Sequence, residues 1–260
     1  MDLKLAGRTV LVTGSSKGIG LSVAQWFARE GVNVCMVARS GEQLEREGNA
    51  IAKEAGVTVR TMAADLSDPA ARERVYNTFP DVDVLVNNAG AIPGGTIHDV
   101  DETAWRAGWD LKVYGYVGLT RHYLAMMERR KRGVIINVIG LGGERLDATY
   151  IAGAVGNAGL MAFTRAIGGK STEHNVRVVG VNPGPVLTDR VEVLGRKRAK
   201  SQHGDESRWR ESFAKMPYGR PASCDEIAAT VVFLASDLSS YTSGTIVTID
   251  GGIANSGGMP

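Results

Sequence analysis

A glycine-rich turn near the start of the chain has the composition of a phosphate-binding loop. It occupies residues 13–20, carries glycines at positions 14, 18 and 20, and follows the apolar run Thr9–Val12. A helical pattern begins directly after it. Glycine lets the backbone turn sharply and approach a ligand, and the first turn of a helix offers free N–H groups and a partial positive charge. The segment therefore predicts a site for a pyrophosphate, such as that of a dinucleotide.

The motifs around this turn point to a known family. The spacing Gly14-x-x-x-Gly18-x-Gly20 differs from the Gly-x-Gly-x-x-Gly of other dinucleotide folds. Together with Asn87-Asn88-Ala89-Gly90, it resembles the short-chain dehydrogenase/reductase (SDR) family. Further family motifs match at Asn182–Gly184, Tyr218–Pro221 and Asp250–Gly252. The resemblance spans the chain and implies a nicotinamide dinucleotide cofactor.

The resemblance also implies which residues hold that cofactor. They belong to the glycine turn and to the segments that follow later strands. In the family, the residues after the third strand contact the adenine, and those after the sixth strand close over the nicotinamide. The implied set is Gly14, Ser16, Lys17, Gly18, Ile19, Gly20, Arg39, Asp65, Leu66, Asn88, Ala89, Gly90, Pro183, Gly184, Val186 and Thr188.

The end of the second strand predicts the type of cofactor. An acidic residue there would accept a hydrogen bond from a free ribose 2′-hydroxyl and repel a 2′-phosphate. Here the position is Ala38, followed by Arg39, and Lys17 lies within the glycine turn. Two cations and no carboxylate favour a phosphate. We therefore expect NADP(H) ahead of NAD(H), the alternative being that both cations are solvated loop charges.

The catalytic residues that the resemblance implies are replaced. In the family a tyrosine transfers the proton, a lysine four residues later lowers its pKa, a serine orients the carbonyl, and an asparagine completes a proton relay. Matching the motifs places Gly153 at the tyrosine and Asn157 at the lysine. Lys112 stands at the asparagine and Gly140 at the serine. We therefore expect an atypical member of the family, with all four positions substituted.

Tyr150 is the other candidate for the tyrosine, and Ala154 would then stand at the lysine. That match inserts three residues into a helix and rotates the rest of it by about 300°. We hypothesise instead that Tyr150 leans across Gly153 and forms a relocated acid system with Lys112, with Asn157 as a polar anchor. The alternatives are structural: a packing tyrosine, an exposed lysine, and an asparagine bonded to nearby backbone.

Charged segments follow these positions. The loop 142–147 should lie near the nicotinamide, where Glu144, Arg145 or Asp147 could act on a substrate or simply face solvent. Residues 189–216 are dense in arginine and lysine, show poor periodicity, and occupy the position of the family's substrate lid. Such a run fits an anionic substrate, although a solvated flexible face is the alternative.

The elements that position these residues alternate along the chain. Apolar, β-branched runs are expected to form strands at 9–12, 32–37, 58–63, 82–86, 134–138, 177–181 and 245–249. Amphipathic stretches between them, at 42–55, 70–79, 109–130, 156–167 and 225–235, are expected to be helices. This alternation predicts an α/β fold, a Rossmann-type doubly wound parallel sheet of about seven strands with helices on both faces. We find no linker, so residues 1–260 are expected to form one domain.

The composition of the chain limits the kinds of partner that we expect it to bind. A formal charge of +2 gives no electrostatic case for nucleic acid or an anionic membrane, and no apolar run reaches the length of a membrane span. Cys35 and Cys224 have no metal-ligand spacing, and no His/Cys/Asp/Glu cluster indicates a metal site. We expect a cytoplasmic protein. The resemblance implies pairing of two long helices into a homodimer or homotetramer.

The leading prediction is an NADP(H)-dependent oxidoreductase that acts on a small organic carbonyl, alcohol or related substrate through a non-standard proton donor. Two alternatives stay open. One is a non-redox enzyme, such as a lyase, isomerase or dehalogenase, on the same scaffold. The other is a catalytically silent NADP(H)-binding protein. Net oxidation of NADPH across a panel of carbonyl compounds separates the first from the other two.

Overall fold

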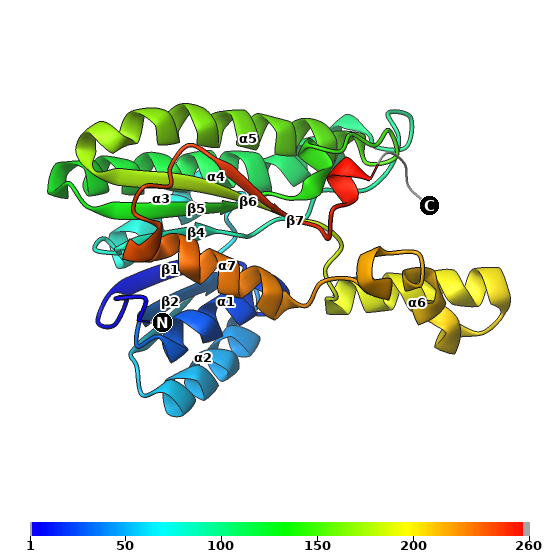
Figure 1. The fold of residues 1–260 in the computed structure, drawn as a ribbon, viewed down its shortest axis with the longest axis horizontal. Coiled ribbons are helices and arrows are strands. Elements are labelled where there is room, and N and C mark those ends of the chain that lie inside the picture. Colours follow the sequence, from blue (N-terminus) through cyan, green and yellow to red (C-terminus); the bar gives the residue numbers. More distant parts are fainter. Residues whose placement is uncertain (1, 257–260) are drawn as a thin grey trace.

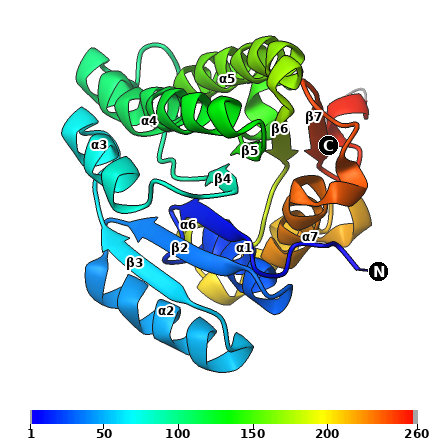
Figure 2. The ribbon, with the colours of Figure 1, turned by 90° about the vertical axis from the view of Figure 1, so that its left-hand side faces the viewer.

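Seven parallel strands form one sheet in the order β3-β2-β1-β4-β5-β6-β7 (Figures 1 and 2). The computed structural model describes residues 2–256, apart from the side chains of Arg190, Leu194, Lys197, Arg198 and Gln202. The strand order reverses between β1 and β4, which opens a crevice at the carboxyl ends of the strands. The strands are β1 (Thr9–Thr13), β2 (Asn33–Ala38), β3 (Val59–Ala63), β4 (Val84–Asn87), β5 (Gly133–Val138), β6 (Val176–Pro183) and β7 (Ile246–Ile249).

Helices cover both faces of the sheet, as predicted (Figure 2). One face carries α1 (Gly18–Arg29), α2 (Gly41–Ala55) and α7 (Cys224–Ala235), and the other carries α3 (Pro69–Thr78), α4 (Glu102–Arg130) and α5 (Ile151–Lys170). Alternate residues of β1 point to opposite cores, with Val10 and Val12 on the α1 side and Leu11 on the α4 side. Burial on both faces explains why the strands are almost entirely apolar.

Two helices extend beyond the predicted limits. Helix α4 begins at Glu102 rather than Trp109, because the Asp101 carboxylate caps it by accepting from the Ala104 N–H at 2.8 Å. Helix α5 runs over 151–170 rather than 156–167. The sequence pattern missed these turns because polar residues and glycines interrupt the apolar periodicity there.

The predicted lid segment is helical rather than irregular. It contains α6 (Asp189–His203) and a 3-10 segment (Glu206–Phe213), and it projects beyond the carboxyl end of β6 (Figure 1). Trp209 and Phe213 pack edge to face in a small core of its own. Of the basic residues noted in the sequence, Arg190, Lys197 and Arg198 fall outside the described side chains.

A buried polar chain ties the strand ends to the helices. Asn87 and Asn137 lie opposite each other in β4 and β5, and the Asn87 Nδ2 donates to the Asn137 Oδ1 at 2.9 Å. The Asn87 amide also donates to Thr120 of α4, and the Asn137 amide donates to Thr164 of α5. These bonds fix α4 and α5 relative to the sheet, and both helices carry candidate catalytic residues. Across residues 2–256, no helix is long and apolar enough to cross a membrane.

Candidate active site

The glycine turn is held in a conformation that only glycine adopts easily. Gly14 and Gly18 have φ angles of +66° and +58°. A Cβ on Gly20 would lie 2.3 Å from the Gly14 oxygen and 2.5 Å from the Asn88 Nδ2. The first turn of α1 therefore packs directly against the loop, and its N–H groups face the crevice.

Hydrogen bonds join this turn to the Asn-Asn-Ala-Gly segment. The Thr13 hydroxyl accepts from the backbone N–H groups of Asn88 and Ala89, at 2.9 and 3.0 Å. The Asn88 side-chain amide donates to the Thr13 carbonyl at 2.9 Å. Two loops far apart in the sequence thus form one rigid rim.

A cavity of about 350 Å³ lies along this rim. Eleven of the predicted cofactor residues line it: Gly14, Ser16, Lys17, Gly18, Ile19, Arg39, Leu66, Asn88, Ala89, Gly90 and Thr188. Pro183 and Gly184 line a second, larger cavity instead. The remaining three predicted residues line neither cavity. Gly20 packs against the Gly14 carbonyl, and Asp65 accepts two hydrogen bonds from Ser67. Val186 is buried, and its backbone pairs with Ala222.

The part of this cavity that we match to the adenosine ribose carries positive charge. Lys17 and Arg39 line it and are both exposed, and Ala38, the last residue of β2, immediately precedes Arg39. Asp65 has its pKa lowered, first by the Ser67 backbone N–H and to a smaller extent by Arg39. Asp189 lies on the same lining, at the start of α6.

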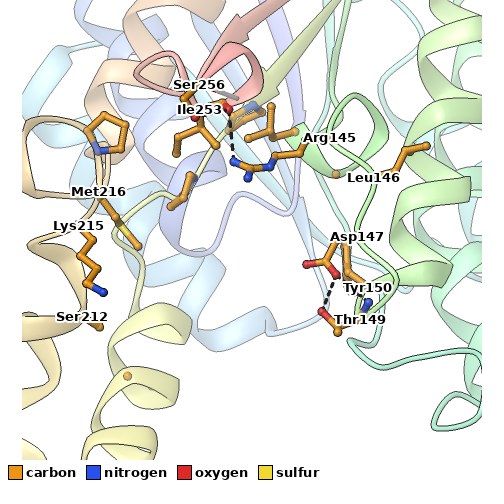
Figure 3. Close-up of a pocket in the computed structure, with 18 of the residues that line it drawn as sticks. Arg145, Leu146, Asp147, Thr149, Tyr150, Ser212, Lys215, Met216, Ile253 and Ser256 are labelled. Carbon is orange, nitrogen blue, oxygen red and sulfur yellow. Dashed lines mark hydrogen bonds between the residues drawn. The ribbon is translucent and has the colours of Figure 1, made fainter. Parts of the chain in front are cut away.

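The second cavity brings the three candidate catalytic residues together. It measures about 2050 Å³ and lies between the lid and the loop that joins β5 to α5. Lys112 on α4 and Asn157 on α5 line this cavity, and so does Tyr150, which immediately precedes α5. Figure 3 shows Tyr150 beside Asp147 and Thr149 on one wall of this cavity, opposite Ser212 and Lys215 of the lid.

Lys112 lies between the two cavities. Its chain packs under Gly90, where a Cβ would approach the Lys112 Cδ to 2.9 Å, and its ammonium donates to the Ile139 carbonyl. The side chain keeps some exposure to the cleft, but protein surrounds the ammonium, and this burial lowers its pKa from 10.5 to about 8. The alternative of a solvent-exposed helix cation is therefore wrong.

Tyr150 occupies the space that Gly153 leaves free. A Cβ on Gly153 would lie 2.0 Å from the Cε1 and Cζ atoms of the Tyr150 ring. The backbone of Tyr150 pairs with Gly95 in an isolated bridge. Burial, and to a smaller extent the Tyr150 phenol, raise the pKa of Tyr116, which lies one turn after Lys112 on α4. A Cβ on Gly142 would lie 3.1 Å from the Tyr150 ring and 3.5 Å from the Asn157 Nδ2, so the ring lies near the Asn157 amide.

Asn157 is 2% exposed, and its side chain turns toward Gly140. A Cβ on Gly140 would lie 3.3 Å from the Asn157 Nδ2, so the amide lies against the position that we match to the family serine. Within the described residues, the Asn157 Oδ1 has no hydrogen-bond partner. Buried polar atoms are normally hydrogen-bonded, so this enclosed oxygen is an exception in the packing around the site.

Comparison with known proteins identifies the family. The family model described as enoyl-(acyl carrier protein) reductase matches residues 14–254. A solved structure of a short chain dehydrogenase/reductase family protein is 32% identical, with a TM-score of 0.83 and coverage of 96% of this chain and 98% of that one. The chain belongs to the short-chain dehydrogenase/reductase family.

Other relatives of this SDR are reductases. The 3-oxoacyl-(acyl carrier protein) reductase of Aquifex aeolicus is 30% identical over 97% of this chain and 100% of its own length. The L-sorbose reductase of Gluconobacter frateurii, solved with NADPH and L-sorbose, is 31% identical, with a TM-score of 0.92 and coverage of 98% and 100%. The SDR described here is an oxidoreductase of this family.

The cradle of the SDR fits a nicotinamide dinucleotide. Helix α1 begins at this rim, and the first N–H groups of a helix have no partner within the helix. The glycines allow close approach of a pyrophosphate. A Cβ on Gly18 would lie 3.5 Å from the Thr188 methyl group, so the start of α6 stands over the turn. The buried acceptor of Asn157 and the ammonium of Lys112 lie further along the same crevice.

Glu144 has a structural role that the sequence did not reveal. Its carboxylate accepts from the Asn182 amide at 3.1 Å and from the Thr248 hydroxyl at 2.6 Å. It therefore joins the loop after β5 to β6 and β7, although the residue is exposed to solvent. Its partners lie 38 and 104 residues away along the chain, so only the tertiary fold could show them.

Proposed function

We propose that this SDR is an NADP(H)-dependent oxidoreductase of a small organic carbonyl or alcohol, with Lys112 and Tyr150 replacing the usual proton donor. The observation that carries the proposal is the convergence of Lys112, Tyr150 and Asn157 on one cleft beside the glycine-turn cavity. The lining of that cavity by Lys17 and Arg39, without a carboxylate at Ala38, supports the 2′-phosphorylated cofactor.

The residues that would hold NADP(H) are those of the glycine turn, the Asn-Asn-Ala-Gly segment, and Thr188. When bound, the nicotinamide supplies a hydride to the carbonyl carbon or removes one from the alcohol carbon. The protein must then deliver or accept one proton at the substrate oxygen, so that carbonyl, hydride and proton together give the alcohol.

Lys112 is suited to that proton transfer. With a pKa of about 8, its ammonium is charged at neutral pH and releases a proton more readily than an ordinary lysine. The Tyr150 hydroxyl stands at the cleft wall, where it can hydrogen-bond the substrate oxygen. Asn157 lines the same cleft next to Gly140, and we assign it the role of a polar anchor for the site.

The test is turnover by two conservative variants. NADPH oxidation and alcohol formation are followed together, by absorbance and by mass spectrometry, for the wild type, Lys112→Met and Tyr150→Phe. We expect kcat to fall about 10²-fold or more in Lys112→Met. Lys53→Met, on the surface of α2, and Tyr218→Phe, an exposed tyrosine, are the matched controls and should keep wild-type rates.

Wild-type kcat in both Lys112→Met and Tyr150→Phe would contradict the relocated acid system. Product without net consumption of NADPH would favour a non-redox enzyme on this scaffold. Nucleotide binding without any turnover across the panel would favour a silent NADP(H)-binding protein.

We also propose a cytoplasmic homotetramer or homodimer. Tyr114 and Val155, on α4 and α5, are about half exposed in the single chain, and these are the helices that the family pairs between subunits. Light scattering on the purified protein measures the mass of the assembly, and a monomer would contradict this part of the proposal.

A further inference from the structure

Two cations face the larger cavity from opposite walls. Arg145 belongs to the loop after β5, and Lys215 follows the 3-10 segment of the lid. Figure 3 shows the Lys215 side chain on the lid wall beside Ser212, and the Arg145 side chain extended toward the lid from the opposite wall. The Arg145 guanidinium is half-buried and donates to the Ile253 carbonyl at 3.3 Å, which fixes its position.

The carboxylates of the same lining are engaged elsewhere. Glu211 accepts two hydrogen bonds from Arg208, both at 2.8 Å, so that pair is close to neutral. Asp147 accepts from the Thr149 backbone N–H and hydroxyl, each at 2.7 Å, and Arg145 stabilises its charge only weakly. Among the described residues, neither Arg145 nor Lys215 has a carboxylate within ion-pair distance.

We propose that the substrate carries a carboxylate bound at Arg145, with Lys215 on the facing wall adding positive charge to the cavity, while its reacting carbonyl lies at Lys112 and Tyr150. This inference rests on the proposed function. A guanidinium offers a planar pair of N–H donors that matches a carboxylate, and a lysine adds a mobile point charge. The substrate class is therefore a small oxo acid or hydroxy acid.

The experiment compares acids with their neutral counterparts. Aliphatic oxo acids of three to six carbons and their methyl esters are titrated by calorimetry into the protein saturated with NADP⁺, and kcat/KM is measured with NADPH. Dihydroxyacetone phosphate and dihydroxyacetone form a second pair, which distinguishes a phosphate from a carboxylate. We expect at least one oxo acid to bind about tenfold or more tightly than its ester.

Variants then locate the anion site. Lys215→Met and Arg145→Met should each lower the acid-to-ester ratio about tenfold, with little effect on the ester. Lys215 is exposed, so its replacement should not affect folding, and Lys200→Met, on α6 and outside the cavity lining, is the matched control. Retained binding of NADPH shows that each variant is folded.

Three results would overturn the inference. The first is that no oxo acid binds more tightly than its ester, and the second is that the acid-to-ester ratio stays unchanged in both Lys215→Met and Arg145→Met. The third is that the protein prefers the anionic compound only in the pair of dihydroxyacetone phosphate and dihydroxyacetone. Preference for the acid in binding, lost in both variants but without any oxidation of NADPH, would uphold the anion site and contradict the proposed oxidoreductase chemistry. Oxidation of NADPH with neutral carbonyl compounds alone would uphold the proposed oxidoreductase chemistry and contradict the anion site.

Discussion

Replacing Lys112 with methionine should stabilise the fold at neutral pH. Burial lowers the pKa of this ammonium from 10.5 to about 8, and one pKa unit corresponds to about 1.4 kcal/mol. Keeping the charge inside the protein at pH 7 therefore costs the folded state about 3 kcal/mol. Methionine removes this cost and also the hydrogen bond to the Ile139 carbonyl, worth about 1–2 kcal/mol. The net gain at pH 7 should be about 1–2 kcal/mol.

The pH dependence gives the sharper measurement. Between pH 8 and pH 10.5 the unfolded chain holds the Lys112 proton and the folded protein does not, so the stability of the wild type rises with pH across this window. Lys112→Met lacks that rise. The difference in the free energy of unfolding between the two proteins should thus move by about 3 kcal/mol between pH 7 and pH 10.5, in favour of the wild type.

Urea denaturation at a fixed protein concentration measures both quantities. Groups shared by the two proteins cancel in the difference, and Lys53→Met controls for the loss of an exposed lysine. A stability difference that stays constant from pH 7 to pH 10.5 would refute the enclosure of the ammonium. A lower stability of Lys112→Met at both pH values would show that the hydrogen bond outweighs the desolvation.

Three further substitutions test other parts of the structure. Gly153→Ala should displace the Tyr150 ring, because the new Cβ would lie 2.0 Å from ring atoms, and kcat should fall at least tenfold. The control is Gly169→Ala on the same helix, where a Cβ meets no atom within 4 Å, and this variant should keep its activity. Arg39→Ala should raise KM for NADPH about tenfold and leave KM for NADH nearly unchanged; equal changes for both would contradict a 2′-phosphate contact. Arg177→Met removes hydrogen bonds to three backbone carbonyls around the end of α7 and should lower the free energy of unfolding by about 2–3 kcal/mol, as measured in urea.

The sheet could be predicted from sequence because its five central strands are buried on both faces. Each of the seven expected strands is present, with limits that differ by one or two residues at most ends. The apolar, β-branched composition of a central parallel strand is a strong local signal. The helices of the lid were harder to predict from sequence, because this charged segment packs around its own small core at Trp209 and has no continuous apolar face.

The candidate site was only partly accessible from the sequence. Helical spacing and the small size of Gly153 were enough to bring Tyr150 and Asn157 into one hypothesis, and the structure places both on one cleft with Lys112. Sequence could not reveal that the Lys112 ammonium is enclosed, because its surroundings come from the segment at Gly90 and the end of β5. The assignment of catalytic roles stays a prediction.

The contact between Tyr150 and Gly153 limits how this chain can evolve. A tyrosine introduced at position 153, which we match to the family's proton donor, would begin with a Cβ inside the existing ring. Position 150 must therefore become small before position 153 can become large, and the intermediate carries no phenol at either place. A lysine at position 157 is of little use until that exchange is complete. The arrangement that we match to the family is thus separated from the present one by at least two coupled substitutions, and a change by single steps would pass through proteins without either tyrosine.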